Sequence, residues 1–250
     1  MTDKDVISEV QHYLKFVKSF GCTGLSCTPE TMGIIESWQP RPDANPKPQP
    51  APSPPLSQPE SSSQPESLES MGNAIHQCRR CRLFGERKSA VFGSGPETAK
   101  LMLIGGFPEA ADEDSGMPYS GEEGELLTRI IEAIKFERES VYICHMVKCR
   151  PKDGNAPDRF VAKACRTWLD RQINAIHPAI ICVFGELAAQ VLLRTDMPLD
   201  RLRGRFHDYD GIPVMPTLDP GHLLANQDAK RAVWEDMKRV MKACKDLNIY

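Results

Sequence analysis

Four cysteines of this chain have a spacing that suits metal binding. Cys78 and Cys81 form a Cys-x-x-Cys pair, the usual spacing for two thiolates on one metal. Cys149 follows an apolar run, and Cys165 comes early in a segment of helical periodicity, so both could reach a site beside the first pair. Soft thiolates select zinc or iron–sulfur, and four-cysteine sets serve either. The spacing therefore predicts one four-cysteine metal centre and leaves the metal open.

The other cysteines show no comparable pattern. The total of nine is odd, and a chain of 250 residues does not need disulfides in order to fold, so we expect reduced thiols. Cys22 and Cys27 have no second pair of ligands near them and are expected to be free. Cys144, Cys182 and Cys244 fall in predicted strands or in the last predicted helix, which indicates core or surface residues rather than ligands.

The elements that position these residues alternate along the chain from residue 71 onward. Short apolar runs are separated by segments in which apolar residues recur every three or four positions, which predicts strands and helices. This alternation, with strands that are apolar throughout, is typical of an α/β fold with a mostly parallel sheet covered on both faces. The predicted strands are LMLIG (101–105), VYICHMV (141–147), AIICVFG (179–185) and IPVMPT (212–217), and the predicted helices cover about 122–136, 156–176, 185–194 and 226–247.

Ligands of such sheets bind outside the carboxyl ends of the strands. In this sequence those ends are 105–108, 145–150, Gly185 and 217–222. We therefore expect the functional side chains to gather in these four segments.

Two further segments precede this domain. Residues 1–38 have apolar side chains at helical steps, which predicts a small helical appendage that packs on the domain or docks onto a protein partner. Residues 39–70 hold ten of the 21 prolines, mixed with Ser, Gln and Glu. Such a segment cannot bury enough apolar surface to offset its ordering entropy, so we expect a disordered linker. The main domain is expected over residues 71–250.

The composition, 40% hydrophobic and 26% charged, fits a globular protein. No apolar run approaches the ~20 residues that span a bilayer, and the polar N-terminus has no apolar signal core. We therefore expect a cytoplasmic protein without a membrane partner, and a monomer. The net charge of −3 comes mainly from residues 1–70, so the main domain is close to neutral. Any contact with nucleic acid must then come from a local basic patch.

The main domain resembles the type-4 uracil-DNA glycosylases over about residues 71–245. The resemblance implies a [4Fe–4S] cluster rather than zinc, because all four cysteines named first match in order and setting. It also implies a three-layer α/β/α sandwich around a parallel four-stranded sheet. The matching runs are HQCRRCRLFGERKSAVFGSGPETAKLMLIG, GMPYSGEEGELLTRII, VYICHMVKCRP, ACRTWLDRQINAIHPAIICVFGELAAQVLL, RLRGRFHDYDGIPVMPT and KRAVWEDMKRV.

Enzymes of this family flip uracil out of the duplex and cleave its N-glycosidic bond with water. The resemblance implies that Tyr119, where the family usually has Phe, stacks on the base. Gly106 stands where the family usually has a water-activating carboxylate, and His145 stands where an Asn usually reads the uracil edge. Asp219 replaces the histidine of the last motif, which donates to the leaving uracil.

These departures allow more than one interpretation of the site. An ionised Asp219 would repel the developing uracil anion, by roughly 1–4 kcal/mol at effective dielectrics of 80 to 20. His222, three residues later, is one candidate for the missing donor. In a second hypothesis Asp219 activates water and His145 donates to the leaving group. The alternatives are a DNA-binding relative with little or no activity and a glycosylase for another damaged base; an electron-transfer protein would leave the pocket-like loops unexplained.

Contact with uracil-containing DNA would need cations for the phosphates and a wedge for the gap left by the base. Arg203 and Arg205, together with Arg201, alternate in DRLRGRFH, which indicates phosphate contacts or a solvated charged hairpin. Leu223 falls where the family carries its wedge, although it or Leu224 could equally belong to the core of a following helix. The arginines around the first cysteine pair form a second candidate patch: Arg79, Arg80 and Arg82.

Overall fold

The computed structural model describes residues 67–249. The predicted appendage, 1–38, lies outside the described residues, and so does the predicted linker up to residue 66. The last residues of that linker are described, and they are helical: α3 (Leu68–His76) begins three residues before the expected start of the main domain. Ser67 caps this helix, since its side chain accepts a hydrogen bond from the Ser70 N–H.

All four predicted strands form, and they make one parallel sheet. They are β1 (Leu101–Gly105), β2 (Tyr142–His145), β3 (Ile180–Phe184) and β5 (Ile212–Thr217). Every residue of the first three strands is buried. Their sequences are apolar throughout because helices cover both faces of the sheet.

The described part of the sheet has five strands rather than the predicted four, in the order β2-β1-β3-β5-β4. The additional strand, β4 (His207–Tyr209), pairs antiparallel with β5 at the edge. Asp210 and Gly211 connect the two strands with φ angles of 49° and 87°. Two successive positive φ angles are typical of a type I′ hairpin turn, for which Asp-Gly is a favoured sequence.

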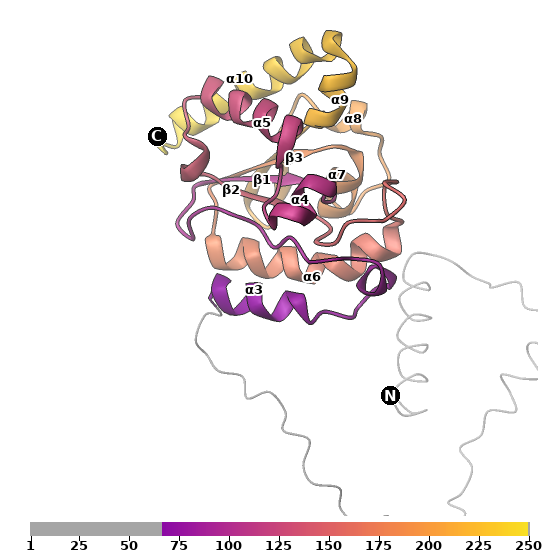
Figure 1. Cartoon of the computed structure of the whole chain (residues 1–250). Coiled ribbons are helices and arrows are strands. Elements are labelled where there is room, and N and C mark those ends of the chain that lie inside the picture. Colours follow the sequence, from indigo (N-terminus) through magenta and orange to yellow (C-terminus); the bar gives the residue numbers. More distant parts are fainter. Residues whose placement is uncertain (1–66, 250) are drawn as a thin grey trace, which may run out of the picture. The chain divides into compact units, whose positions relative to one another are not determined.

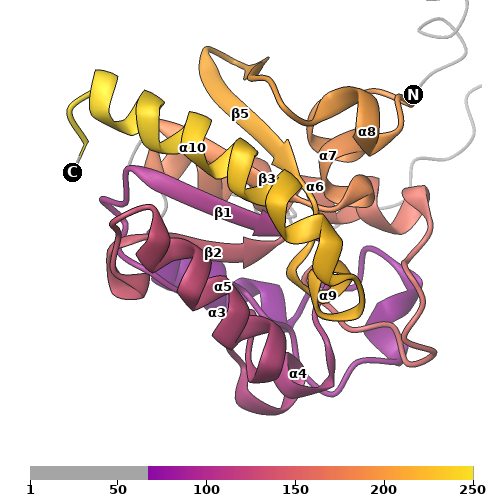
Figure 2. The ribbon, with the colours of Figure 1, turned by 90° about the horizontal axis from the view of Figure 1, so that it is seen from above.

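Helices form a layer on each face of the sheet, which confirms the predicted three-layer α/β/α arrangement (Figure 1). One apolar core lies between the sheet and α3, α6 (Arg159–Ile176), α7 (Glu186–Leu192) and α8 (Leu199–Leu202). The other lies between the sheet and α5 (Gly121–Ala133), α9 (Pro220–Ala225) and α10 (Lys230–Asp246). Figure 2 shows α9 beyond the carboxyl ends of β1 and β2. The remaining elements are η1 (Arg82–Gly85), α4 (Ala110–Ser115), η2 (Arg138–Ser140) and η3 (Gln227–Ala229).

The end of β5 is tied to α10 by a buried carboxylate. Asp236 of α10 is 1% exposed, and its Oδ2 accepts hydrogen bonds from the Thr217 hydroxyl at 2.7 Å and from the Arg203 guanidinium at 2.8 Å. Breaking a buried charge pair by removing one partner leaves the other charge uncompensated in a poorly solvated place. This contact therefore holds the segment before Asp219 against the last helix.

We expect Asp236→Ala to lower the free energy of unfolding by about 3–5 kcal/mol, because Arg203 then loses its buried partner. Urea unfolding followed by circular dichroism measures this change. The neighbouring Glu235, which is half-exposed and whose ion pair within the described residues is with Lys238, provides the matched control: Glu235→Ala should change stability by less than about 0.5 kcal/mol. Similar losses in the two variants would contradict this account of Asp236.

Candidate active site and cysteine cavity

The carboxyl ends of β1 and β2 bring three of the predicted site residues together. Gly105 and His145 are register partners in the parallel pair. The ring of Tyr119 lies over this edge, with its centroid 4.7 Å from that of the His145 ring and the two planes tilted by 39°. A Cβ atom on Gly105 would stand 2.2 Å from the Tyr119 hydroxyl and 2.6 Å from His145 Nδ1. Only glycine therefore allows both polar groups to approach the strand.

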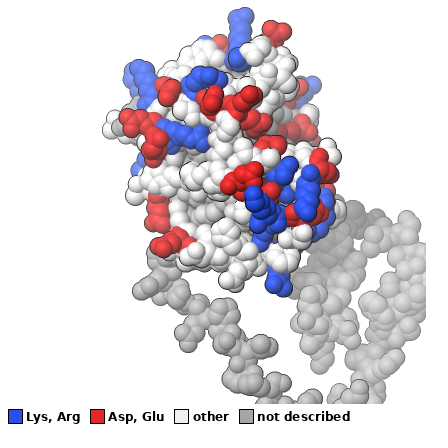
Figure 3. Space-filling view, in the orientation of Figure 1, with Lys and Arg blue, Asp and Glu red and all other residues white. Residues whose placement is uncertain are grey.

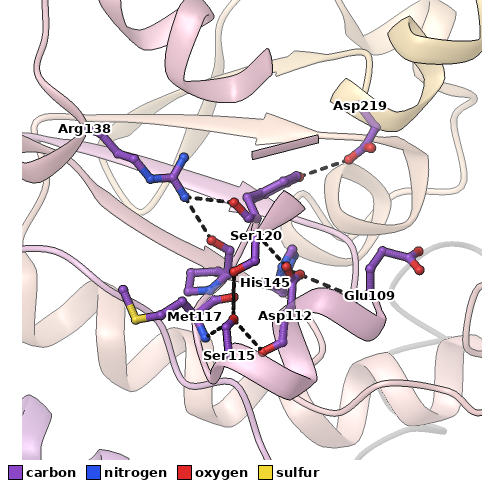
Figure 4. Close-up of polar contacts among 10 residues, drawn as sticks. Glu109, Asp112, Ser115, Met117, Ser120, Arg138, His145 and Asp219 are labelled. Atoms are coloured by element: carbon purple, nitrogen blue, oxygen red, sulfur yellow. Dashed lines mark hydrogen bonds and ion pairs between the residues drawn. The ribbon is translucent and has the colours of Figure 1, made fainter. Parts of the chain in front are cut away.

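Tyr119 is held in an unusual backbone conformation. Its φ of 53° lies in the left-handed region, which is rare for an aromatic residue. The Arg138 guanidinium fixes this turn by donating to the Pro118 and Tyr119 carbonyls, both at 3.0 Å (Figure 4). Gly124 has to be glycine as well, since its Cβ would lie 1.7 Å from the Tyr119 carbonyl oxygen. The ring is therefore preorganised over the strand ends.

His145 is paired with a carboxylate that the sequence did not reveal. Its Nε2 lies 2.9 Å from Asp112 Oδ2 of α4, and both side chains are 3% exposed. Burial alone would raise the pKa of Asp112, but the hydrogen bond and charge of His145 and the N–H groups of Ser120 and Glu109 hold it below its usual value. Nδ1 of His145 is buried and has no hydrogen-bond partner among the described residues. It is therefore free to meet a bound polar group.

Asp219 acts in this structure as a hydrogen-bond acceptor on both of its oxygens. Oδ2 accepts from the Tyr119 hydroxyl at 3.0 Å, and Oδ1 accepts from the Gly221 N–H at 2.9 Å, which makes Asp219 the cap of α9. Burial, followed by the nearby Asp219 charge, raises the pKa of the Tyr119 hydroxyl well above its usual value, so this hydroxyl remains a donor.

The other predicted site residues differ in their exposure. Gly106 is partly exposed, and a Cβ placed on it would meet nothing within 4 Å, so the position of the family's carboxylate faces open space. His222 is exposed on the first turn of α9. Leu223 was expected to be either a DNA wedge or a core residue, and its side chain is 1% exposed and belongs to the core on the α5 and α10 side. Leu224 is the more accessible of the two leucines.

The predicted basic segment lines an open groove, but its arginines differ in their contacts. Arg203 makes the ion pair with the buried Asp236 described above, so it is a structural residue first. Arg205 is exposed, and it donates to the Arg201 carbonyl at 3.1 Å. Figure 3 shows Lys and Arg interspersed with Asp and Glu over the face in view, as expected for a domain near neutrality. The groove is lined by Met197, Asp200, Arg201, Arg203, Gly204 and Arg205.

All four predicted ligand cysteines line one cavity between α3, η1 and α6. Cys78 and Cys81 follow α3, Cys149 follows β2, and Cys165 belongs to α6, as the sequence predicts. Within residues 67–249, no three ligand side chains converge on a single point. The four thiols share one cavity, but in this structure they are not placed as ligands of a single ion. Of the other cysteines, Cys144, Cys182 and Cys244 are buried in the two cores, while Cys22 and Cys27 lie outside the described residues.

N–H donors lie close to three of the four sulfur atoms. Arg87 lies 3.0 Å from Cys149 Sγ, the indole N–H of Trp168 lies 3.3 Å from Cys78 Sγ, and the Lys148 backbone N–H lies 3.4 Å from Cys165 Sγ. The Lys148 side chain is fully buried, lines the same cavity and lies close to the Cys144 thiol, but within the described residues its Nζ makes no hydrogen bond of good geometry. A buried ammonium needs a counter-charge. The site therefore fits an anionic group held by thiolates.

Comparison with known proteins identifies the family. The sequence model of the uracil DNA glycosylase superfamily matches residues 92–238, more than half of the chain. A type-4 uracil-DNA glycosylase of Saccharolobus solfataricus is 33% identical over 187 residues, which cover 71% of this chain and 87% of that protein. The protein of the same name from Thermotoga maritima is 30% identical over 181 residues, 71% of this chain and 94% of that protein.

An α/β/α domain with Tyr119, His145 and Asp219 gathered at its strand ends and this match together define the class: the chain belongs to the uracil DNA glycosylase superfamily. Within the superfamily it is similar to the type-4 proteins, which confirms the resemblance seen in the sequence. None of the described helices has the length and apolar character needed to cross a membrane.

We expect Asp112→Asn to lower the free energy of unfolding at pH 7 by about 2 kcal/mol, the worth of one hydrogen bond to a charged group. Because the folded-state pKa of Asp112 is lowered, its stabilising contribution is present above about pH 4 and is lost as the pH falls further. Stability measured from pH 7 down to pH 3 should fall less steeply in the variant. Glu125→Gln, on the exposed side of α5, is the control, and an equally steep fall in both proteins would contradict the assignment.

Proposed function

We propose that this protein hydrolyses the N-glycosidic bond of a uracil flipped out of DNA, with a rearranged set of polar groups. The observation that carries the proposal is the Tyr119 ring fixed over the paired ends of β1 and β2, with the unpartnered His145 Nδ1 beneath it. An aromatic face and a convergent polar atom at strand ends are what a flipped base requires. The likeness to type-4 uracil-DNA glycosylases supports uracil as that base.

Each pocket residue then has a separate role. Tyr119 stacks on the base, and His145, oriented by Asp112, reads the polar edge of uracil through Nδ1. The open space in front of Gly106 admits the attacking water. Asp219 orients the Tyr119 hydroxyl by accepting its hydrogen bond, and it is the carboxylate assigned to accept a hydrogen bond from the water. The exposed His222 lies one turn further from these groups along α9.

DNA contact is assigned to the exposed basic groove and to the start of α9. Arg205 and Arg201 are free to meet phosphates, whereas Arg203 shapes the groove through its contact with Asp236. Leu224 takes the wedge position in place of the buried Leu223.

Cys78, Cys81, Cys149 and Cys165 are proposed to hold a [4Fe–4S] cluster. The support is the cavity that the four thiols share, the three N–H groups near their sulfur atoms and the buried Lys148 ammonium. When bound, the cluster ties α3, β2 and α6 together through its iron–thiolate bonds. We further propose a cytoplasmic monomer whose residues 1–38 dock onto a protein partner, because reduced thiols suit that compartment and the sequence favours a helical appendage.

Uracil excision is tested with the protein purified without oxygen. We expect base release from uracil-containing oligonucleotides and none from matched thymine controls, read as alkali-sensitive strand cleavage. Tyr119→Ala should lower the rate at least about 100-fold, since it removes the stacking face and the donor to Asp219.

Met117→Ala is the control for the Tyr119 variant, because Met117 lies in the same turn but is half-exposed, and its hydrogen bonds with Ser115 and Ser120 are made by its backbone. If the wild type binds the oligonucleotide but releases no uracil, the activity is absent and a DNA-binding relative is the better description. Release of a different damaged base would instead reassign the substrate.

Cluster binding is tested by iron and sulfide content. A single Cys→Ser substitution at any of the four ligands should remove most of the iron and the broad thiolate-to-iron absorbance, because three thiolates hold a cluster poorly. The four variants are Cys78→Ser, Cys81→Ser, Cys149→Ser and Cys165→Ser. Cys182→Ala, in β3 and away from the cavity, should keep both. Full iron content in the four ligand variants would contradict the assignment, and stoichiometric zinc in the wild type would replace the cluster with a single metal.

A further inference from the structure

Glu123 lies in the first turn of α5 and faces the first turn of α9. A Cβ atom on Gly221 would stand 2.2 Å from Glu123 Oε1 and 3.2 Å from Asp219 Oδ1. The two carboxyl groups therefore share the small space that Gly221 leaves between the helices. The sequence gave no reason to single out Glu123, since it is one of three glutamates in the run GEEGE.

The surroundings of Glu123 are acidic on every side that packs against it. Asp219 of α9 and Glu109 and Asp112 of α4 all act on it electrostatically, and the Tyr119 hydroxyl lies near it. Among residues 67–249, no basic side chain forms an ion pair with Glu123. A partly buried carboxyl among like charges favours its neutral form. Burial, followed by the charges of Asp219, Glu109 and Asp112, raises the pKa of Glu123 to about 7.

A donor to the leaving uracil is the role that the pocket otherwise lacks. Asp219 accepts hydrogen bonds on both oxygens, so it has no proton to give in this arrangement. The unpartnered, buried His145 Nδ1 marks where a polar edge of the base would lie, next to the Tyr119 hydroxyl. A neutral carboxyl beside Asp219, at the same edge of the pocket, is a competent donor.

We propose that the neutral carboxyl of Glu123 donates its proton to the uracil as the glycosidic bond breaks, an assignment that rests on the glycosylase activity proposed above. The bond between uracil N1 and C1′ breaks with its electron pair on uracil, which takes the Glu123 proton. The oxygen of a water molecule forms the new bond to C1′, and a proton of that water returns to the Glu123 carboxylate. The net change is one water consumed, one uracil and one abasic sugar released.

This assignment fixes the direction of the pH dependence. A proton donor is active in its protonated form, so the rate should be constant below about pH 7 and fall about tenfold for each further pH unit. A water-activating base with the same pKa would give the opposite slope. The exposed His222, one residue from Gly221, is tested separately with His222→Gln.

The experiment measures uracil release from single-stranded oligonucleotides between pH 5.5 and pH 9. Glu123→Ala should lower the rate about 100-fold and abolish the decrease in rate above pH 7, here called the falling limb. Glu123→Gln should keep more of the rate and also lack the falling limb, because an amide can donate a hydrogen bond at every pH. The limb should persist in His222→Gln. Glu122→Gln, a change at the exposed neighbour, should match the wild type.

Gly221→Ala tests the geometry without removing a titratable group. Gly221 has no left-handed φ, so alanine is tolerated there, but the new methyl would displace the flexible Glu123 carboxyl toward water. The falling limb should move to lower pH by at least one unit. Carbon-13 NMR of labelled glutamate carboxyls provides a readout that does not depend on turnover: one signal should titrate near pH 7 and be missing in Glu123→Gln.

The outcomes separate the two proposals. If the wild type releases uracil but Glu123→Ala keeps its rate and its falling limb, the role of Glu123 is overturned while the glycosylase stands. A rate that rises through pH 7 and loses this rise in Glu123→Ala would overturn the donor role in favour of a base. If neither the wild type nor any variant releases uracil at any pH, the proposed activity fails. The donor role then fails with it, even if the NMR signal of Glu123 titrates near pH 7.

Discussion

The close approach of side chains to the end of β1 is the constraint on which the pocket depends. Tyr119 and His145 can both lie against Gly105 only because that residue has no Cβ. The approach in turn requires the left-handed Tyr119 turn, which Arg138 and Gly124 hold from behind. A strained backbone conformation of this kind persists only where several independent contacts hold it in place. The pocket is therefore rigid because its backbone is crowded, and its polar groups are arranged on that frame.

Acidic groups dominate that frame, and this distinguishes the site from a simple anion-binding pocket. Asp219 caps α9, Asp112 orients His145, and Glu123 shares the space at Gly221. Of these three groups, Glu123 has the raised proton affinity, because burial and the charges of Asp219, Glu109 and Asp112 all favour its neutral form. A site that lacks a fixed cation can in this way still provide a proton to a leaving anion.

The sequence predicted the sheet and the cysteine cavity better than the pocket. Continuous apolar runs located all four parallel strands, because strands buried on both faces leave no other pattern. The Asp210-Gly211 turn signal of the β4 hairpin was present in the sequence. The strand before it was missed because three residues are too few to show a strand pattern. Asp112 and Arg138 could not be found, since their partners are distant in sequence. The sequence left the wedge and core roles of Leu223 open because a helix of six residues gives too little periodicity to separate its buried face.

The position of the cysteine cavity has a consequence for how the chain reaches its native state. Cys81 and Cys149 are separated by about 70 residues that include β1, α4, α5 and β2, and closing a loop of that length costs chain entropy before any ligand is gained. The Lys148 ammonium is buried only after β2 has joined the sheet. A nascent chain therefore brings together only the local Cys78 and Cys81 pair. The cavity lined by all four cysteines forms only after β2 and α6 have joined the sheet, so any group held there has to bind late in folding.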